Sequence, residues 1–193
     1  QGKLDEDGRK KLETLKTLAK RMELFVERLF QYSKLSRVEL KSAKVDVSEL
    51  IANVIDIQNI WLQERNATVE IVDEMPMIVY DPPQIEEVFR NLITNGVKYN
   101  DKDQKKITIG CKYRPVKNSE PIPVFWVGDN GIGIDSEHKK HIFKIFKRLH
   151  GRDEYGGGSG AGLTIVWKII ERHNGQIWVE SEKGKGSVFY FTL

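Results

Sequence analysis

Two asparagines and a lysine recur along one face of a helix that the sequence predicts after residue 81. Asn91 and Asn95 are four residues apart, Lys98 follows three residues later, and Glu87 precedes Asn91 by four. A face that only meets solvent would more often carry Glu, Lys or Arg, because Asn is a poorer helix former. Amide oxygens can ligate Mg²⁺, and a lysine ammonium can neutralise a phosphate. We interpret this face as a candidate site for a metal ion and phosphate groups, with a solvated surface as the alternative.

An acidic residue and two glycines follow the apolar run 124–127. The sequence from Asp129 reads Asp-Asn-Gly-Ile-Gly-Ile, and Gly131 and Gly133 would let a flat ring approach the backbone closely. An ionised carboxylate only accepts hydrogen bonds, so Asp129 matches the exocyclic amino group of adenine and not the carbonyl of guanine. Such a bond contributes about 1.5–3 kcal/mol, which predicts a preference for ATP over GTP of at least about tenfold. The alternative is an Asn-Gly turn in a β-hairpin.

Glycines dominate the segment 155–163, which reads Tyr-Gly-Gly-Gly-Ser-Gly-Ala-Gly-Leu and runs into a predicted amphipathic helix. Backbone N–H groups at a helix start attract anions, and the helix dipole adds to the attraction. A segment with so few side chains can also close over a bound ligand. No Gly-Lys-Ser/Thr follows, so the segment is not a P-loop, and the polar residues before it argue against a dinucleotide-binding fold. The alternative is a flexible linker, although a linker would not run directly into an amphipathic helix.

Aromatic and basic residues lie between these two glycine-bearing segments. Phe143 and Phe146 have helical spacing and are predicted to pack in the core, while Arg148 is a candidate contact for phosphate. His173 closes the predicted helix before a glycine cap at Gly175, so we predict a structural role for it.

Residues 5–36 predict one long helix with an apolar seam of the coiled-coil or bundle type. Two series with a spacing of seven residues make the seam: Leu15, Met22 and Leu29, and Leu18, Phe25 and Tyr32. Such a helix cannot bury its seam alone, so we expect a partner helix from another part of the protein or from a second copy. A simple surface helix of the main domain is the alternative.

Helices and strands alternate after a connector at 37–47. Ser48 and Asp81 are the predicted N-caps of two helices, with prolines in the first turn of the second helix and Asn66 as the stop signal of the first. Strands are predicted at 45–47, 68–72, 77–80, 107–113 and 124–128, further helices at 136–146 and about 160–173, and a closing hairpin at 176–181 and 187–192. The core face of the helix after Asp81 would contain Ile85, Val88, Phe89, Leu92, Ile93 and Gly96. This order predicts a layered α/β sandwich.

Composition narrows the class of protein. The chain has 193 residues, enough for one buried domain plus an appendage. Its formal net charge is only +3 and charges of both signs are interspersed, so we expect no nucleic-acid binding. The single cysteine, Cys111, lies in an alternating strand-like run and fits a reducing, cytoplasmic location. No apolar run approaches the ~18 residues of a membrane helix, so any membrane contact would use regions outside this chain, and the histidines lack the company of other metal ligands.

In their order and spacing, these motifs resemble the ATP-binding domain of sensor histidine kinases, from about residue 45 to the end. The resemblance is closest to phytochrome-like and related bacterial kinases. Residues 91–99 look like the N box of that family, and residues 129–133 look like its first glycine box. Residues 142–146 resemble its F box, and residues 158–163 its second glycine box. Two departures are mild: Gly96 stands where Ala is usual, and the second glycine-rich segment has an extra glycine.

The resemblance implies a Bergerat-type α/β (α+β) two-layer sandwich, a mixed sheet covered on one face by helices, with ATP and Mg²⁺ as ligands. Asp129 would bind adenine, and Asn91 and Asn95 would hold Mg²⁺ and the phosphates. Asn91 and Lys98 would be the catalytic residues. Further contacts to ATP would come from Asn91, Asn95, Lys98, Tyr99, Gly131, Gly133, Ile134, Arg148, Gly158, Ser159, Gly160, Ala161, Gly162 and Leu163.

The resemblance also implies a division of the chain. Residues 1–40 would be the second helix of a helical-hairpin dimerisation domain, and residues 41–193 the ATP-binding catalytic domain. None of the histidines matches the family's acceptor motif, so the acceptor helix would precede residue 1. The expected partners are a second copy, bound through the N-terminal helix, and the receiver domain of a response regulator.

Three functions remain open from the residues. The first is transfer of the γ-phosphoryl group of ATP to a histidine, for relay to an aspartate of a response regulator. The second is an ATP-hydrolysing enzyme of the same superfamily, but such enzymes carry Glu where Asn91 stands, and Asn cannot take a proton from water at neutral pH. The third is a non-catalytic nucleotide-binding module that signals by changing shape.

Overall fold

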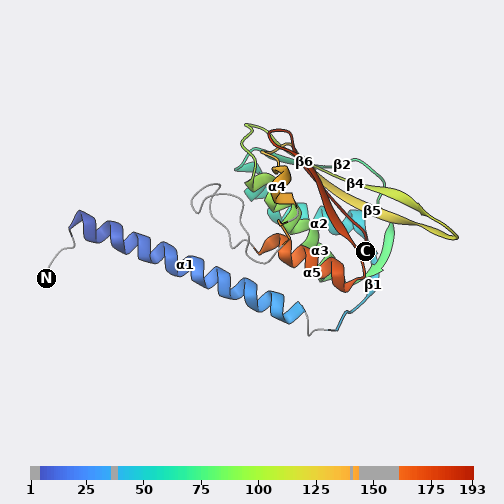
Figure 1. Cartoon of the computed structure of the whole chain (residues 1–193), viewed down its shortest axis with the longest axis horizontal. Coiled ribbons are helices and arrows are strands. Elements are labelled where there is room, and N and C mark those ends of the chain that lie inside the picture. The colour runs from blue at the N-terminus through green and yellow to red at the C-terminus, as the bar shows by residue number, and fades with distance from the viewer. Residues whose placement is uncertain (1–4, 36–38, 140, 144–160) are drawn as a thin grey trace.

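The computed structural model describes residues 5–35, 39–139, 141–143 and 161–193. Helix α1 (Glu6–Leu35) confirms the long N-terminal helix and extends away from the rest of the chain (Figure 1). Its seam residues Leu15, Met22 and Leu29 are exposed, with 63%, 70% and 45% of their surface accessible. Near the C-terminus of α1, Leu35 packs against the hydrophobic core. The seam is therefore presented to solvent along most of its length, as expected for a helix that needs a partner.

Five strands form a mixed sheet in the order β2-β4-β5-β7-β6. Strands β2 and β4 are parallel, and the other neighbours are antiparallel. A separate two-stranded sheet pairs β1 with β3 antiparallel. The strands are β1 (Ala43–Asp46), β2 (Ala67–Ile71), β3 (Met77–Tyr80), β4 (Lys105–Val116), β5 (Ser119–Asp129), β6 (Ile177–Glu182) and β7 (Gly186–Phe191).

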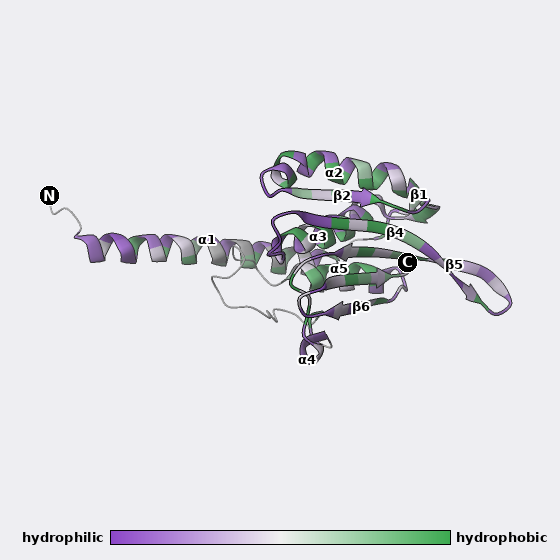
Figure 2. Ribbon diagram, turned by 90° about the horizontal axis from the view of Figure 1, so that it is seen from above, coloured by the Kyte–Doolittle hydropathy of each residue, from purple (hydrophilic) through white to green (hydrophobic). Residues whose placement is uncertain are grey.

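Helices α2 (Val47–Gln63), α3 (Pro82–Lys98) and α5 (Gly162–Arg172) pack on one face of the five-stranded sheet (Figures 1 and 2). The core between the two layers contains Phe89 of α3, Phe125 of β5 and Phe191 of β7, all fully buried. The ring of Phe89 lies 6.2 Å from that of Phe125 and 5.6 Å from that of Phe191, between centroids. This is the two-layer sandwich that the sequence predicted. The predicted core face of α3 is confirmed in full.

Helix α3 begins as predicted. The side chain of Asp81 accepts a hydrogen bond from the backbone N–H of Gln84, and prolines occupy the first turn. The cap predicted for α2 is wrong. Asp46, not Ser48, caps that helix by accepting from the N–H of Glu49 at 3.1 Å, because β1 ends at Asp46 and Ser48 is already helical.

The predicted cap of α5 is also corrected. Asn174 adopts the left-handed conformation with a φ of 59°, and the N–H of Gly175 donates to Ile170 O at 2.9 Å. Asn is the second choice for this position after Gly. Gly175 is still required, because a Cβ atom there would collide with the carbonyl oxygen of Thr192.

Strands β4 and β5 are longer than predicted and form a hairpin that reaches beyond the sheet (Figure 1). The predicted helix at 136–146 is shorter in the described residues. Helix α4 spans Ser136–Lys139, and residues 141–143 form a turn. The end of that predicted helix, with Phe146, lies outside the described residues.

Candidate nucleotide-binding site

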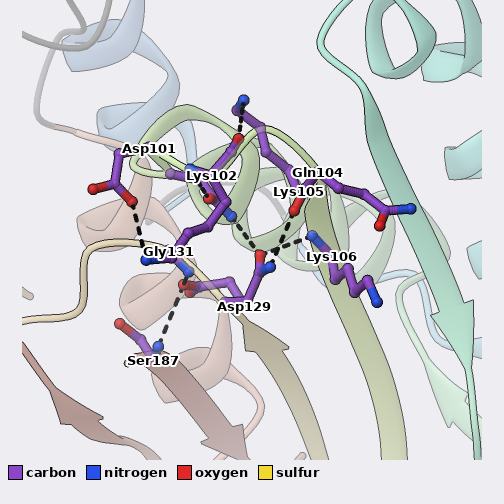
Figure 3. Close-up of polar contacts among 10 residues, drawn as sticks. Asp101, Lys102, Gln104, Lys105, Lys106, Asp129, Gly131 and Ser187 are labelled. Atoms are coloured by element: carbon purple, nitrogen blue, oxygen red, sulfur yellow. Dashed lines mark hydrogen bonds and ion pairs between the residues drawn. The ribbon is translucent and has the colours of Figure 1, made fainter. Parts of the chain in front are cut away.

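Asp129 is the last residue of strand β5 and is half-buried. Its Oδ1 atom accepts hydrogen bonds from the backbone N–H groups of Gly131 at 2.9 Å and Ser187 at 3.3 Å (Figure 3). Burial raises the pKa of the Asp129 carboxyl to about 6, and these two hydrogen bonds oppose the rise. Within the part of the chain that the structure describes, both hydrogen bonds to the side chain use Oδ1. Oδ2 is therefore available to accept a hydrogen bond from a ligand.

The loop after Asp129 is held by a network that sequence reasoning missed. Asn130 Oδ1 accepts from Asn100 Nδ2 and from the Lys106 N–H, both at 2.8 Å, and Asn130 Nδ2 donates to Gln104 O at 3.1 Å. The sequence offered Asn130 only as the first residue of an Asn-Gly pair. In the fold this residue ties the end of β5 to the segment between α3 and β4, which fixes the position of Asp129.

The two glycines of this loop serve contacts between backbone segments. A Cβ atom on Gly131 would collide with the carbonyl oxygen of Tyr99, at the end of α3. Gly133 has a φ of 68° and packs in the same way on Glu182. Ile134 is tied nearby through its N–H, which donates to Ser181 Oγ at 2.7 Å. The glycines thus allow close approach of the backbone, as predicted, but the partner seen in the structure is the protein itself.

Helix α3 places Asn91, Asn95 and Lys98 on one half-buried face, as predicted. The amide nitrogen of Asn91 donates to Glu87 Oε1 at 2.6 Å and to Glu87 O at 2.9 Å. These bonds leave the amide oxygen of Asn91 on the opposite side, away from Glu87. Glu87 in turn forms an ion pair with Arg90. The sequence placed Glu87 on this face but gave no sign that it orients Asn91.

Helix α5 begins directly beside these amides. A Cβ atom on Gly162 would stand 2.8 Å from Asn91 Oδ1 and 3.8 Å from Asn95 Nδ2. Ala161 is buried, and Leu163 packs against the core. The structure therefore brings the described end of the glycine-rich segment against the α3 face. The other predicted members of this group, Arg148, Gly158, Ser159 and Gly160, lie outside the described residues.

The C-terminal end of α3 joins the two clusters. Lys98 Nζ lies 5.2 Å from the centre of the Tyr99 ring. The Tyr99 carbonyl oxygen accepts from the N–H of Ile132 at 3.1 Å, which links α3 to the loop after Asp129. On the core side of α3, a Cβ on Gly96 would stand 3.0 Å from the Cβ of Asp129. The small residue at Gly96 therefore allows α3 to lie against the carboxylate.

These donor atoms fit Mg²⁺ and a nucleoside triphosphate. A held amide oxygen at Asn91 is a hard oxygen ligand of the kind that Mg²⁺ accepts alongside phosphate oxygens and water. The ionised carboxylate of the half-buried Asp129 can accept but not donate, so its Oδ2 atom suits an amino group on a flat ring.

Comparison with known proteins identifies the family. The sequence profile of the "Histidine kinase-, DNA gyrase B-, and HSP90-like ATPase" family matches residues 80–193. The chain belongs to this family. Over 190 residues it is 47% identical to cyanobacterial phytochrome B of Nostoc sp. (strain PCC 7120 / SAG 25.82 / UTEX 2576), an alignment that covers 98% of this chain and 25% of that protein. The chain thus spans about a quarter of the length of this relative.

Solved structures of histidine kinases share the fold of this chain. Full-length ShkA in complex with AMPPNP has a TM-score of 0.75 at 22% identity, covering 99% of this chain and 39% of that one. Histidine kinase ThkA in complex with the response regulator protein TrrA has a TM-score of 0.72 at 25% identity, covering all of this chain and 52% of that one. Among the described residues, no helix is both long and apolar enough to cross a membrane.

Proposed function

We propose that this chain binds ATP with Mg²⁺ between α3, α5 and the loop after β5, and passes the γ-phosphoryl group to a histidine of a sensor kinase. The observation that carries the proposal is the half-buried Asp129, whose Oδ2 is left to accept while Oδ1 accepts from two backbone N–H groups. Adenine presents an amino group to such an acceptor, whereas guanine presents a carbonyl oxygen.

Each member of the α3 face has a proposed role. Asn91 and Asn95 hold Mg²⁺ and orient the phosphates, and Lys98 neutralises phosphate charge. Mg²⁺, when bound, supplies charge neutralisation for the group in transfer. Glu87 keeps the Asn91 amide turned so that its oxygen is available. The remaining residues shape the nucleotide site. Those that the structure describes are Tyr99, Gly131, Gly133, Ile134, Ala161, Gly162 and Leu163. Arg148, Gly158, Ser159 and Gly160 belong to segments that the structure does not describe.

The transfer needs positioning rather than covalent chemistry from this chain. A ring nitrogen of the acceptor histidine bonds to the γ-phosphorus as the bond to the β–γ bridging oxygen breaks, and ADP leaves. Asn91 occupies the position where hydrolysing members of the superfamily carry Glu. An amide cannot take a proton from water at neutral pH, so water is a poor competitor of the imidazole.

Partners follow from the same proposal. The exposed seam of α1 fits a second copy, so that residues 1–40 serve dimerisation and residues 41–193 catalysis. The response regulator bound to ThkA supports a receiver domain as the second partner. A cytoplasmic location and the absence of nucleic-acid binding stay predictions from the composition.

The proposal is tested in the full-length protein with γ-labelled ATP. We expect label that is stable in base, labile in acid and located on histidine, and we expect its loss in Asp129→Asn. Steady release of phosphate without labelled protein would favour the hydrolysing enzyme. ATP binding with neither labelling nor turnover would favour the non-catalytic module.

A further inference from the structure

Asp81 makes one more contact than an N-cap needs. Its Oδ1 atom accepts from the Gln84 N–H at 3.3 Å, which caps α3. Its Oδ2 atom accepts from the backbone N–H of Lys41 at 2.9 Å, forty residues earlier in the chain. Lys41 belongs to the connector between α1 and the two-layer sandwich, so this one carboxylate joins the connector to the start of α3.

Another aspartate cap, Asp46, shows that the second contact is not a general property of caps. Asp46 caps α2 from an exposed position and accepts from Glu49. Asp81 is only 6% exposed. Burial of an ionised carboxylate is unfavourable unless hydrogen bonds replace its lost water, and the connector N–H supplies one of them.

The sequence explains why a side chain makes this contact. Strands β1 and β3 pair up to Ala43 and Tyr80, and a further step of the ladder would need a strand carbonyl opposite Lys41 to accept its N–H. The chain after Tyr80 does not supply it, because Asp81 caps α3 and Pro82 is already the first residue of that helix. The Asp81 carboxylate therefore accepts the Lys41 N–H in place of a strand carbonyl.

The end of β3, the start of α3 and the end of α5 meet at a corner of the fold next to this contact. The ring of His173, at the end of α5, lies 5.3 Å from that of Tyr80, and Arg172 Nη1 donates to Gln84 Oε1 at 3.5 Å. Helix α5 also contacts α1. Helix α3 runs from this corner to Asn91 and Asn95, so the connector is attached to the same helix that carries the candidate phosphate site.

We propose that Asp81 is a positioning residue that latches the connector to α3 and thereby holds α1 in a defined relation to the nucleotide-binding domain. The latch consists of the Lys41 N–H and Asp81 Oδ2. The hydrogen bond itself does not depend on the proposed function. The expected effect of the latch on phosphoryl transfer rests on that function.

The chain offers substitutions that separate the latch from the cap. Asp81→Ser keeps a capping oxygen but is too short, with one oxygen only, to serve both donors. Lys41→Pro removes the donor without touching the cap, and Lys41→Ala is its control because it keeps the N–H. Asp46→Ser is the matched control for loss of an aspartate cap elsewhere.

Hydrogen exchange of the Lys41 amide reads the latch directly. We expect exchange to accelerate roughly tenfold or more in Asp81→Ser, as for loss of a hydrogen bond to a charged acceptor, and to stay unchanged in Asp46→Ser. Equal protection of the Lys41 amide in Asp81→Ser and the unchanged protein would overturn the proposal.

Spin labels on α1 and the sheet test the mechanical consequence. With labels at Glu13→Cys and Glu70→Cys, both exposed, the distance distribution should broaden in Asp81→Ser and in Lys41→Pro but not in either control. Combining the two latch substitutions should add nothing further, because both remove the same bond. Unchanged distributions in both latch variants would overturn the positioning role.

Kinetics of the full-length protein distinguish positioning from a merely structural role. We expect the KM for ATP to stay within about twofold in Lys41→Pro while kcat for histidine labelling falls, since the latch lies away from the nucleotide. A rise in KM with kcat unchanged would contradict the latch. If the unchanged full-length protein labels no histidine, the proposed function fails, but the exchange and distance results still decide the latch.

Discussion

A single methyl group on Gly162 would stand 2.8 Å from the amide oxygen of Asn91. The first residue of α5 thus lies against the first amide of the α3 face. Since Asn91 Nδ2 is held by Glu87, its oxygen cannot turn away without breaking two hydrogen bonds. The space around that oxygen is therefore set by three residues from two helices, and each can be changed separately.

Gly162→Ala should weaken binding of Mg·ATP by roughly tenfold, the equivalent of one hydrogen-bond contribution. The added Cβ would crowd Asn91 Oδ1, and relief would require the amide to move from its held position. Stability should change little, because the crowded atom ends a flexible side chain and Ala is a good helix former. Calorimetric titration and thermal unfolding measure the two effects.

Gly128→Ala serves as the control for Gly162→Ala. A Cβ on Gly128 would meet its nearest neighbours at 3.5 Å or more, which is ordinary van der Waals contact. We expect normal affinity in this variant. Normal affinity in Gly162→Ala as well would show that the Asn91 oxygen takes no part in binding.

Glu87→Ala should reduce the dependence of ATP affinity on Mg²⁺, because the Asn91 amide loses the acceptor that orients it. Glu87→Gln is the matched variant. It also loses the ion pair to Arg90, but it keeps an acceptor oxygen within reach of Asn91 Nδ2. The measurement compares ATP affinity with Mg²⁺ and with a chelator in both variants. Equal Mg²⁺ dependence in Glu87→Ala and the unchanged chain would refute the orienting role.

Asp129→Asn should stabilise the fold at neutral pH. The pKa of Asp129 is raised from 3.8 to about 6 in the folded chain by burial. Between these values the folded state binds more protons than the unfolded state, so stability falls as pH rises from below 3.8 through about 6. Above pH 6 the ionised carboxylate costs up to about 3 kcal/mol, which the neutral amide avoids.

Urea unfolding at several pH values tests the stability effect of Asp129→Asn. The variant and the unchanged chain should be about equally stable below pH 4, and the variant should be more stable at pH 7 to 8. A variant that is less stable at pH 8 would mean that the two hydrogen bonds to the ionised carboxylate outweigh its burial, contrary to the raised pKa of Asp129.

Local patterns predicted the elements that carry their own signals. Helix α3 was predicted from the cap at Asp81 and the prolines after it. The periodicity of polar and apolar positions then predicted the face that contains Asn91 and Asn95. The α2 cap was misplaced by two residues because Asp46 and Ser48 are both good caps, and only the end of β1 decides between them.

Contacts between distant segments could not be read from the sequence. Three examples join residues from different elements. They are the hydrogen bond from Lys41 to Asp81, the hydrogen bonds of Asn130, and the close backbone contact that excludes a side chain at Gly131. Even for Glu87 and Asn91, one helical turn apart, the sequence does not show whether the side chains bond to each other or to water. Sequence patterns place such residues on a face, and the packing of the whole domain decides what they touch.

The central claim is that Asp129 recognises the amino group of adenine, and calorimetry with two nucleotides tests it most directly. Inosine triphosphate carries a carbonyl oxygen where ATP carries the amino group. We expect the unchanged chain to prefer ATP by at least about tenfold and Asp129→Ala to bind both nucleotides weakly with no preference. ATP affinity unaltered by Asp129→Ala would contradict the account.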